Sequence, residues 1–286
     1  MAQSTERYDK AVHAAWRRYG SAVRRLTPGA PSREFQQDGY LVGTLSHDVV
    51  DRVRRAVEAA PTITLRPEDW SPGYRFSEKA RKVEAYLNSG HRYYASTPQL
   101  ERALADVGRE LATPVQAAIG SPWRVVHTRV LETLPAAETR GPNAWHGDGF
   151  PIEIIKVMIY FSPASRATGT TELRLDDERT FVVEGRPGTW LLFKNSEIVH
   201  RGLPPVAGPR LAVELTLVPA FRGRQEPCFA GLNSTYPEHP GWRLRPARWA
   251  WRTLVANRLR GQDGTQPGLR RARHQKTRTK KKQKQR

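Results

Sequence analysis

Short apolar segments separated by turns run through the middle of the sequence. They are rich in β-branched and aromatic residues, and glycine or proline lies between most of them. The segments are 123–131, 152–161, 171–175, 180–183, 189–193 and 210–219. Each is long enough for one strand, and a series of short strands of this kind predicts a sandwich or a jelly roll.

The N-terminal part of the chain shows helical patterns instead. Apolar residues recur at steps of three and four in residues 5–26 and 98–119, which predicts an amphipathic helix in each segment. Ser46 is a suitable N-cap for a third helix, with residues 49–57 supplying its apolar side. The first helix has a basic face, and we expect it to pack on the outside of the sheet. Contact with an acidic surface is the alternative.

Other segments are less regular. Residues 35–42 predict a strand that leads into the helix after Ser46. Residues 61–95 are rich in Pro, Arg and Tyr, and we predict that they are irregular. Pro246 begins a segment in which Trp, Leu and Arg alternate, which predicts a helix over residues 246–260.

Composition limits the class of protein. The chain has 286 residues, enough for a sizeable core, and a net charge of +19 with a pI of about 10.6. Residues 270–286 hold ten Lys or Arg and no acid, so we expect a disordered basic tail over residues 261–286. Cys228 is the only cysteine, the N-terminus has no signal-like apolar run, and no stretch is long enough to span a membrane. We therefore expect a cytoplasmic protein, peripheral at the inner membrane face at most.

Three residues of metal-binding types lie next to predicted strands. His146 and Asp148 are two positions apart, so on an extended segment their side chains point to the same side. His200 follows the apolar run at 189–193. Two histidines and one carboxylate form the facial triad of non-haem Fe(II) oxygenases, which leaves coordination positions open. Arg210, further along the chain, is suited to clamp a carboxylate with two parallel hydrogen bonds.

The order His-x-Asp, distal His and then Arg resembles the Fe(II)/2-oxoglutarate-dependent dioxygenases, and among them the phytanoyl-CoA dioxygenase-like family. The Asp-Gly-Tyr motif at residues 38–40 and the run at 188–193 before the second His are also similar to that family. The resemblance covers residues 35–220. It implies a mainly β fold with flanking helices, a double-stranded β-helix (jelly roll, cupin-like). It also implies that residues 61–95 help to cover the mouth of the site.

The same resemblance implies the chemistry. Iron would be held by His146, Asp148 and His200, which would be the catalytic residues, and Arg210 would bind the distal carboxylate of 2-oxoglutarate. With O2, such enzymes hydroxylate a C–H bond and release succinate and CO2, here on a small molecule or a lipid or glycan precursor. Related halogenases lack the carboxylate ligand, so Asp148 favours hydroxylation. The chain lacks the Gly-Ser-His loop of many relatives, so the substrate end of the pocket need not match theirs.

Further polar and aromatic residues are candidates for contact with the cosubstrate or the substrate. We predict contact with 2-oxoglutarate for His127, Lys156 and Tyr160, and contact with the substrate for Arg129, Trp145 and Phe150. The alternative for His127 and Arg129 is an ordinary solvent-facing position. If Lys156 points into the barrel, we expect it to pair with a carboxylate. If it points outward, it is an ordinary surface lysine. Arg201, next to the second His, is the rival of Arg210 as the carboxylate clamp.

These patterns divide the chain into four parts. They are an N-terminal helix and linker (1–34), the dioxygenase domain (35–245), a Trp- and Arg-rich helix (246–260) and the basic tail (261–286). The alternative function is that of a nucleic-acid-associated protein, an oxygenase or a binding module, that uses the tail. The tail and the Trp- and Arg-rich helix also suit contact with an anionic membrane surface.

Overall fold

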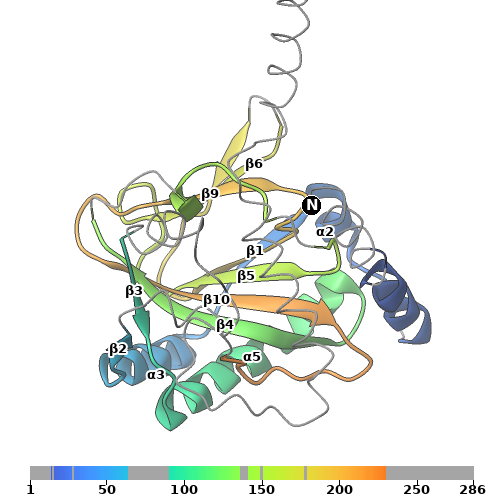
Figure 1. Ribbon diagram of the computed structural model, residues 1–286, viewed down its shortest axis with the longest axis horizontal. Coiled ribbons are helices and arrows are strands. Elements are labelled where there is room, and N and C mark those ends of the chain that lie inside the picture. Colours follow the sequence, from blue (N-terminus) through green and yellow to red (C-terminus); the bar gives the residue numbers. More distant parts are fainter. Residues whose placement is uncertain are drawn as a thin grey trace, which may run out of the picture.

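The computed structural model describes residues 14, 16–27, 29–63, 90–135, 141–148, 151–176 and 179–229. Within these ranges the chain forms two antiparallel sheets, with helices packed below the larger one (Figure 1). The helices are α2 (Arg33–Asp38), α3 (His47–Glu58) and α5 (Pro98–Ile119), and a short 3-10 turn is η2 (Gly141–Asn143). The strands are β1 (Tyr40–Thr44), β2 (Thr62–Ile63), β3 (His91–Tyr94), β4 (Trp123–Thr133), β5 (Ile155–Tyr160), β6 (Thr170–Arg174), β7 (Thr180–Val182), β8 (Thr189–Phe193), β9 (Val199–Leu203) and β10 (Arg210–Pro219).

The strand order shows how the chain winds between the two sheets. The larger sheet has the order β1-β8-β5-β10-β4-β3-β2, and the smaller has the order β7-β6-β9. His146 forms an isolated antiparallel bridge with His200 of β9, so the segment around His146 extends the smaller sheet. From β4 onward, the chain therefore crosses repeatedly between the sheets: β4, β5, β8 and β10 lie in the larger sheet, and the His146 segment, β6, β7 and β9 lie in the smaller. This winding is the predicted double-stranded β-helix, and the prediction is confirmed.

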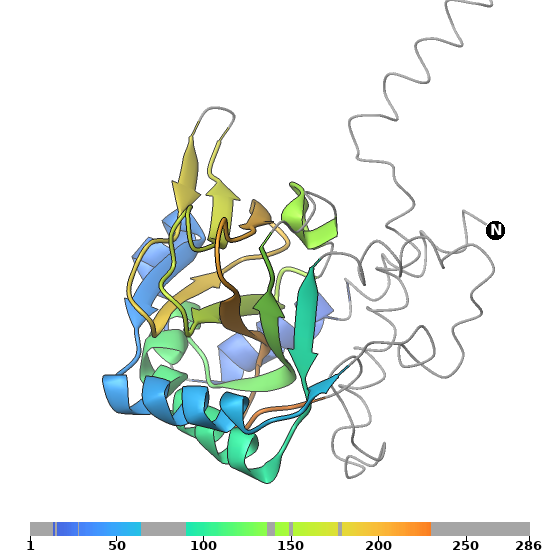
Figure 2. The same cartoon turned by 90° about the vertical axis from the view of Figure 1, so that its left-hand side faces the viewer.

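Alternate residues of the central strands face different layers. In β5, Val157 and Ile159 belong to the apolar core between the larger sheet and helices α3 and α5. Met158 and Tyr160 belong to a second apolar core between the two sheets. Figure 2 shows the two helices beneath the larger sheet and the smaller sheet above it. Lys156 shares a face with Met158 and Tyr160, so its side chain points between the sheets.

The helix boundaries follow the predicted capping residues. α5 begins after Thr97, whose hydroxyl accepts a hydrogen bond from the Leu100 amide at 3.2 Å, and ends at Gly120 with a φ of 70°. The prediction of a helix at 98–119 is therefore confirmed. α3 follows Ser46 as predicted, but Ser46 makes no capping bond. Its hydroxyl instead donates to Glu110 of α5 at 2.9 Å, which joins the two helices.

Three predicted elements differ from the structure by more than two residues. Residues 35–38 belong to helix α2 rather than to a strand, because Ser32 caps this helix and Gly39 ends it with a φ of 74°. Residues 61–95 are not wholly irregular, since β2 and β3 add two short strands to the edge of the larger sheet. β5 begins at Ile155, later than predicted.

The N-terminal helix is described only in part. Residues 16–26 are helical, which agrees with the helix predicted over 5–26 as far as the chain is described. Val23 is fully buried, whereas Leu26 is 74% exposed. The helix therefore uses only part of its predicted apolar face for packing.

Some predictions fall outside the described residues. These are the contact of Phe150, the helix at 246–260 and the basic tail at 261–286. The boundaries of the four predicted parts likewise stay predictions. In the described part of the chain, no helix is both long enough and apolar enough to cross a membrane.

Candidate metal centre

His146, Asp148 and His200 meet at one point between the two sheets. Their ligand atoms all lie within 4.8 Å of one another. Nε2 of His146 is 3.7 Å from Oδ1 of Asp148, and Nε2 of His200 is 3.8 Å from Oδ2 of the same carboxylate. The centres of the two imidazole rings are 4.4 Å apart. The fold thus brings together three residues that are separated in the sequence and that we proposed as metal ligands.

Backbone pairing places these three side chains. The amide of each histidine, His146 and His200, donates to the carbonyl of the other, both at 2.9 Å. Two residues that exchange hydrogen bonds across neighbouring extended segments project their side chains on the same face. The amide of Asp148 donates to the carbonyl of Asn195 at 3.1 Å, which holds the third side chain near the pair.

Each imidazole is oriented by a backbone carbonyl. Nδ1 of His146 lies 2.8 Å from the carbonyl oxygen of Ala144. Nδ1 of His200 lies 2.9 Å from that of Ile198. A carbonyl oxygen only accepts, so Nδ1 carries the proton in each neutral ring and the lone pair lies on Nε2. Metal-binding histidines are commonly held in this way.

The protonation state of the buried His200 ring also suits metal binding. Burial lowers the pKa of His200 to about 3, although the charge of Asp148 acts in the opposite direction, so the ring is neutral at neutral pH. Its Nε2 is buried and has no hydrogen-bond partner among the described residues. Two neutral imidazoles and one carboxylate are the donor set of non-haem Fe(II), so the residues present fit that metal.

One oxygen of the Asp148 carboxylate is already held by two protein donors. Oδ2 accepts a hydrogen bond from the side-chain amide of Asn195 at 2.7 Å and lies 2.6 Å from the ammonium of Lys156. Oδ1 is the oxygen closer to His146. We therefore expect Asp148 to bind a metal through Oδ1 alone.

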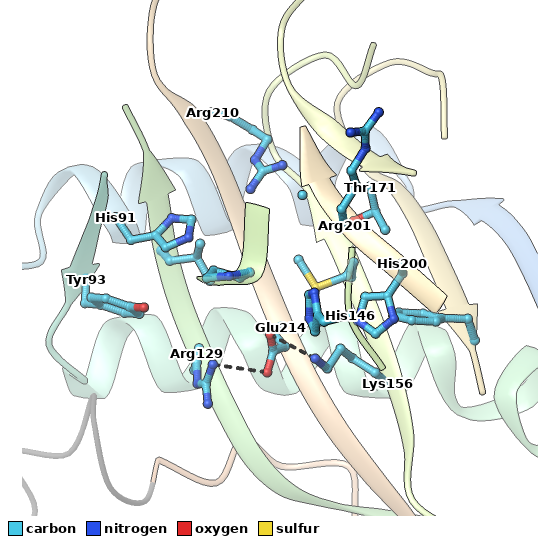
Figure 3. Close-up of a pocket in the computed structure, with 15 residues that line it drawn as sticks. His91, Tyr93, Arg129, His146, Lys156, Thr171, His200, Arg201, Arg210 and Glu214 are labelled. Carbon is cyan, nitrogen blue, oxygen red and sulfur yellow. Dashed lines mark ion pairs between the residues drawn. The ribbon is translucent and has the colours of Figure 1, made fainter. Parts of the chain in front are cut away.

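Lys156 belongs to a line of buried charges. Its ammonium also lies 3.5 Å from Glu214, and the guanidinium of Arg129 lies 3.6 Å from the other oxygen of Glu214 (Figure 3). Burial acts to raise the pKa of Glu214, but Arg129 and Lys156 outweigh it and lower that pKa to about 2. Glu214 therefore remains a carboxylate and holds both cations in place.

Arg210 lies at another end of the cavity that His146 and His200 border (Figure 3). Its guanidinium donates to the backbone carbonyls of Thr170 at 3.0 Å and Leu203 at 3.3 Å. In the described part of the chain no acidic side chain pairs with it, and its buried Nε has no hydrogen-bond partner. A buried charge without a counter-charge is unfavourable, so Arg210 is suited to receive the carboxylate of a ligand.

Thr133 connects Arg210 to His91, a residue that our prediction missed. Thr133 is the register partner of Arg210 in β10 and of His91 in β3, so the three residues form a row across neighbouring strands. The Thr133 hydroxyl accepts from Arg210 at 2.7 Å and lies 3.0 Å from Nδ1 of His91. Burial, with the charges of Arg210 and Arg129, lowers the pKa of His91 to about 3. The cavity therefore has a neutral imidazole beside the buried guanidinium.

His91 and Tyr93 both border the cavity from β3. This strand lies in the segment that we predicted to be irregular. Its sequence signal was the alternation of His91 and Tyr93 within a run rich in aromatic residues. A run of four residues is too short for that signal to be distinguished from a loop.

Arg201 borders the same cavity but is already paired with an acid. Nε of Arg201 donates to Glu172 at 2.7 Å, and Nη2 lies 2.6 Å from the same oxygen. Arg201 is next to His200 in β9, so their side chains leave the strand on opposite faces. Because Glu172 matches its charge, Arg201 is less suited than Arg210 to bind a ligand carboxylate.

Trp145 lies on the Arg201 side of β9 rather than on the His200 side. Its ring centre is 4.5 Å from the guanidinium carbon of Arg201 and 4.4 Å from that of Arg174. Such contacts between guanidinium groups and an aromatic face are favourable. Trp145 packs against these two arginines, and its predicted contact with the substrate stays a prediction.

The other predicted contact residues lie at different depths. Arg129 borders the cavity. His127 is buried on the same strand, and it is not among the described residues that border the cavity. Tyr160 is fully buried between the sheets, where its hydroxyl donates to Thr171 at 2.6 Å. Thr171, rather than Tyr160, forms that part of the cavity wall.

Comparison with known proteins gives no family assignment. No family model matches the chain, and no curated protein matches it. The resemblance to the phytanoyl-CoA dioxygenase-like family therefore stays a prediction.

Solved structures give distant matches. HygX from Streptomyces hygroscopicus, with nickel, 2-oxoglutarate and hygromycin B bound, is 18% identical, with 67% of this chain and 89% of HygX covered at a TM-score of 0.44. The non-haem 2-oxoglutarate-dependent epimerase SnoN from nogalamycin biosynthesis is 18% identical. The match covers 74% of this chain and 96% of SnoN, with a TM-score of 0.47. A prolyl hydroxylase from Trichoplax adhaerens, in complex with a hypoxia inducible factor peptide, is 13% identical. The match covers 71% of this chain and 90% of the hydroxylase, with a TM-score of 0.46. All three TM-scores are below 0.5, so these likenesses leave the family and the activity of this chain undetermined.

Proposed function

We propose that the protein is an Fe(II)- and 2-oxoglutarate-dependent oxygenase that hydroxylates a C–H bond of a small molecule or of a lipid or glycan precursor. One observation carries the proposal. The histidines of a His-Asp-His set and a buried arginine without an acidic partner among the described residues border the same cavity. 2-Oxoglutarate has a metal-chelating end and a distal carboxylate, so it matches both features.

The residues of the chain would have distinct roles. His146, Asp148 and His200 would hold Fe(II), which when bound supplies O2 activation coupled to the conversion of 2-oxoglutarate to succinate and CO2. Arg210 would fix the distal carboxylate and so direct the opposite end of the cosubstrate toward the metal. His91, which is neutral and lies beside Arg210, would add an uncharged hydrogen-bond donor.

The remaining contacts are also part of the proposal. Lys156 and Arg129 border the cavity. We propose that Lys156 contacts the cosubstrate and that Arg129 contacts the substrate. His127 and Tyr160 are buried and are not among the described residues that border the cavity, and we assign them a supporting role.

Anaerobic titration tests the central part of this proposal. Addition of Fe(II) and 2-oxoglutarate should produce the weak visible absorption band of their charge-transfer complex, and His146→Ala or His200→Ala should abolish it. Succinate release in air with pooled cell metabolites would then identify fractions that contain the substrate. Wild-type protein that binds neither Fe(II) nor 2-oxoglutarate would exclude this function.

The basic C-terminal segment supports a second candidate role. Residues 270–286 hold ten Lys or Arg and no acid, a composition suited to phosphate-rich partners. We propose that this segment brings the enzyme to nucleic acid or, through the same electrostatics, to an anionic membrane surface. Either role is compatible with the cytoplasmic location that we propose.

A further inference from the structure

A lysine lies directly behind the proposed metal site. The ammonium of Lys156 is 2.6 Å from Oδ2 of Asp148, the carboxylate that we assign to the metal. Figure 3 shows the Lys156 ammonium directed toward Glu214, with His146 and His200 drawn above the side chain. A bound metal would therefore have a fixed positive charge about one carboxylate away.

Asp148 and Glu214 together hold this ammonium in place. Glu214 lies 3.5 Å from it and also pairs with Arg129. Glu214 cannot be neutralised easily, because the two cations keep it ionised. The line Arg129, Glu214, Lys156 and Asp148 is internally balanced, with two positive and two negative charges.

Orientation of the carboxylate does not by itself require a charged group. Asn195 already donates to Oδ2 of Asp148 at 2.7 Å, and its backbone carbonyl accepts from the Asp148 amide. A neutral donor therefore fixes the same oxygen. The feature that Lys156 adds is its charge.

That charge has opposite effects on the two proposed ligands. A positive charge near the site repels a divalent cation and weakens its binding. The same charge attracts 2-oxoglutarate, which carries two negative charges and chelates the metal on the cavity side. Low effective dielectric between the sheets strengthens both effects.

We propose that the charge of Lys156 shifts metal binding and cosubstrate binding in opposite directions. It lowers the affinity for the divalent metal and raises the affinity of the metal-loaded protein for 2-oxoglutarate. This inference rests on the proposed function, since it takes Asp148 as a metal ligand.

Both affinities can be measured by calorimetric titration with Co(II) as the metal probe, first of the protein with Co(II) and then of the Co(II)-loaded protein with 2-oxoglutarate. Lys156→Met should bind Co(II) alone about tenfold more tightly than the wild type, and the Co(II)-loaded variant should bind 2-oxoglutarate about tenfold more weakly, since one charge next to both ligands is lost. Lys194→Met is the matched control. Lys194 pairs with Glu197 at 3.4 Å away from the cavity lining, so this variant loses the same charge and should keep both wild-type affinities.

Lys156→Gln separates charge from hydrogen bonding, because glutamine retains a donor for Asp148. It should show the same opposite shifts of the two affinities as Lys156→Met. Wild-type affinities in Lys156→Gln, or weaker binding of both Co(II) and 2-oxoglutarate in the two variants, would overturn the inference in favour of a purely orienting role. Absence of His146-dependent Co(II) binding in the wild type would instead overturn the proposed function itself.

Discussion

Asn195 holds Asp148 at two points, since its side-chain amide donates to Oδ2 of Asp148 at 2.7 Å and its backbone carbonyl accepts from the Asp148 amide at 3.1 Å. Asn195 is fully buried. It follows β8 and precedes His200 in the sequence, so one short connection positions the carboxylate and delivers the second histidine. The ligand geometry therefore depends on a residue that we do not expect to touch the metal.

Asn195→Ala should weaken metal binding without removing any ligand. The Asp148 carboxylate would lose a neutral donor that fixes its orientation, and the loss of such a supporting contact costs roughly ten- to hundredfold in metal affinity. Calorimetric titration with Co(II) would measure the effect. The control is Ser196→Ala, because the buried Ser196 hydroxyl has no hydrogen-bond partner among the described residues. Equal loss in both variants would contradict the role of Asn195.

Arg210→Ala should weaken binding of 2-oxoglutarate while metal affinity alone stays close to that of the wild type. Loss of a charge-assisted bidentate contact costs about 3 kcal/mol, which corresponds to roughly a hundredfold rise in Kd. Arg201→Ala is the comparison, because Arg201 is paired with Glu172 and should matter less. Equilibrium binding of 2-oxoglutarate to the metal-loaded protein measures both. A larger loss in Arg201→Ala would show that Arg201 is the clamp.

Glu214 should make the stability of the protein depend on pH in the acid range. Its folded-state pKa of about 2 lies below the ordinary value of 4.5, so the ionised carboxylate stabilises the fold above pH 4.5. That contribution, of order 3 kcal/mol at most, is lost as the pH falls from about 4.5 toward about 2. Urea unfolding should therefore show Glu214→Gln as destabilised at pH 6, with a difference from the wild type that shrinks below pH 4.5. A difference that is constant over this range would argue against the ionised carboxylate.

The ionised carboxylate of Glu153 should destabilise the fold, in contrast to that of Glu214. Its side chain is fully buried, neither oxygen has a hydrogen-bond partner among the described residues, and Arg24 is 3.9 Å away. Burial raises the pKa of Glu153, so the ionised form opposes folding at neutral pH and this cost disappears as the pH falls. Glu153→Gln should therefore raise Tm at pH 7 by roughly 2–4 °C. Glu197→Gln, which removes a more exposed carboxylate, should leave Tm nearly unchanged, and a lower Tm in Glu153→Gln would refute the argument.

Deletion of residues 264–286 should separate catalysis from partner binding. The segment from 270 has ten basic residues and no apolar pattern, so we expect thermal stability and uncoupled 2-oxoglutarate turnover to remain. Binding to RNA, DNA or anionic vesicles should fall, and in the full-length protein this binding should weaken steeply with salt. Comparing the three partners distinguishes a nucleic-acid role from a membrane role. Loss of turnover in the truncated protein would show that the segment contributes to the site.

The sequence by itself determined the main strands of the barrel and the order of the metal-binding residues. Turns and apolar runs are local properties, and they were sufficient to predict β8 and β10 and the helix α5 with their observed bounds. The spacing of His146 and Asp148 was likewise enough to predict that they share a face. Helix α2 was missed because its caps, Ser32 and Gly39, enclose only a short helix next to a strand-like run.

Only the tertiary structure decided which polar residues surround the site. Glu214 lies beside Arg129 because β10 pairs with β4 in that register, and it reaches Lys156 because β5 pairs with the other edge of β10. The same pairing across three strands places His91 near Arg210. A strand sequence shows which residues share a face, but it does not show which strand lies next to it or in which register. That information arises from long-range packing, which joins segments that have no local signal in common.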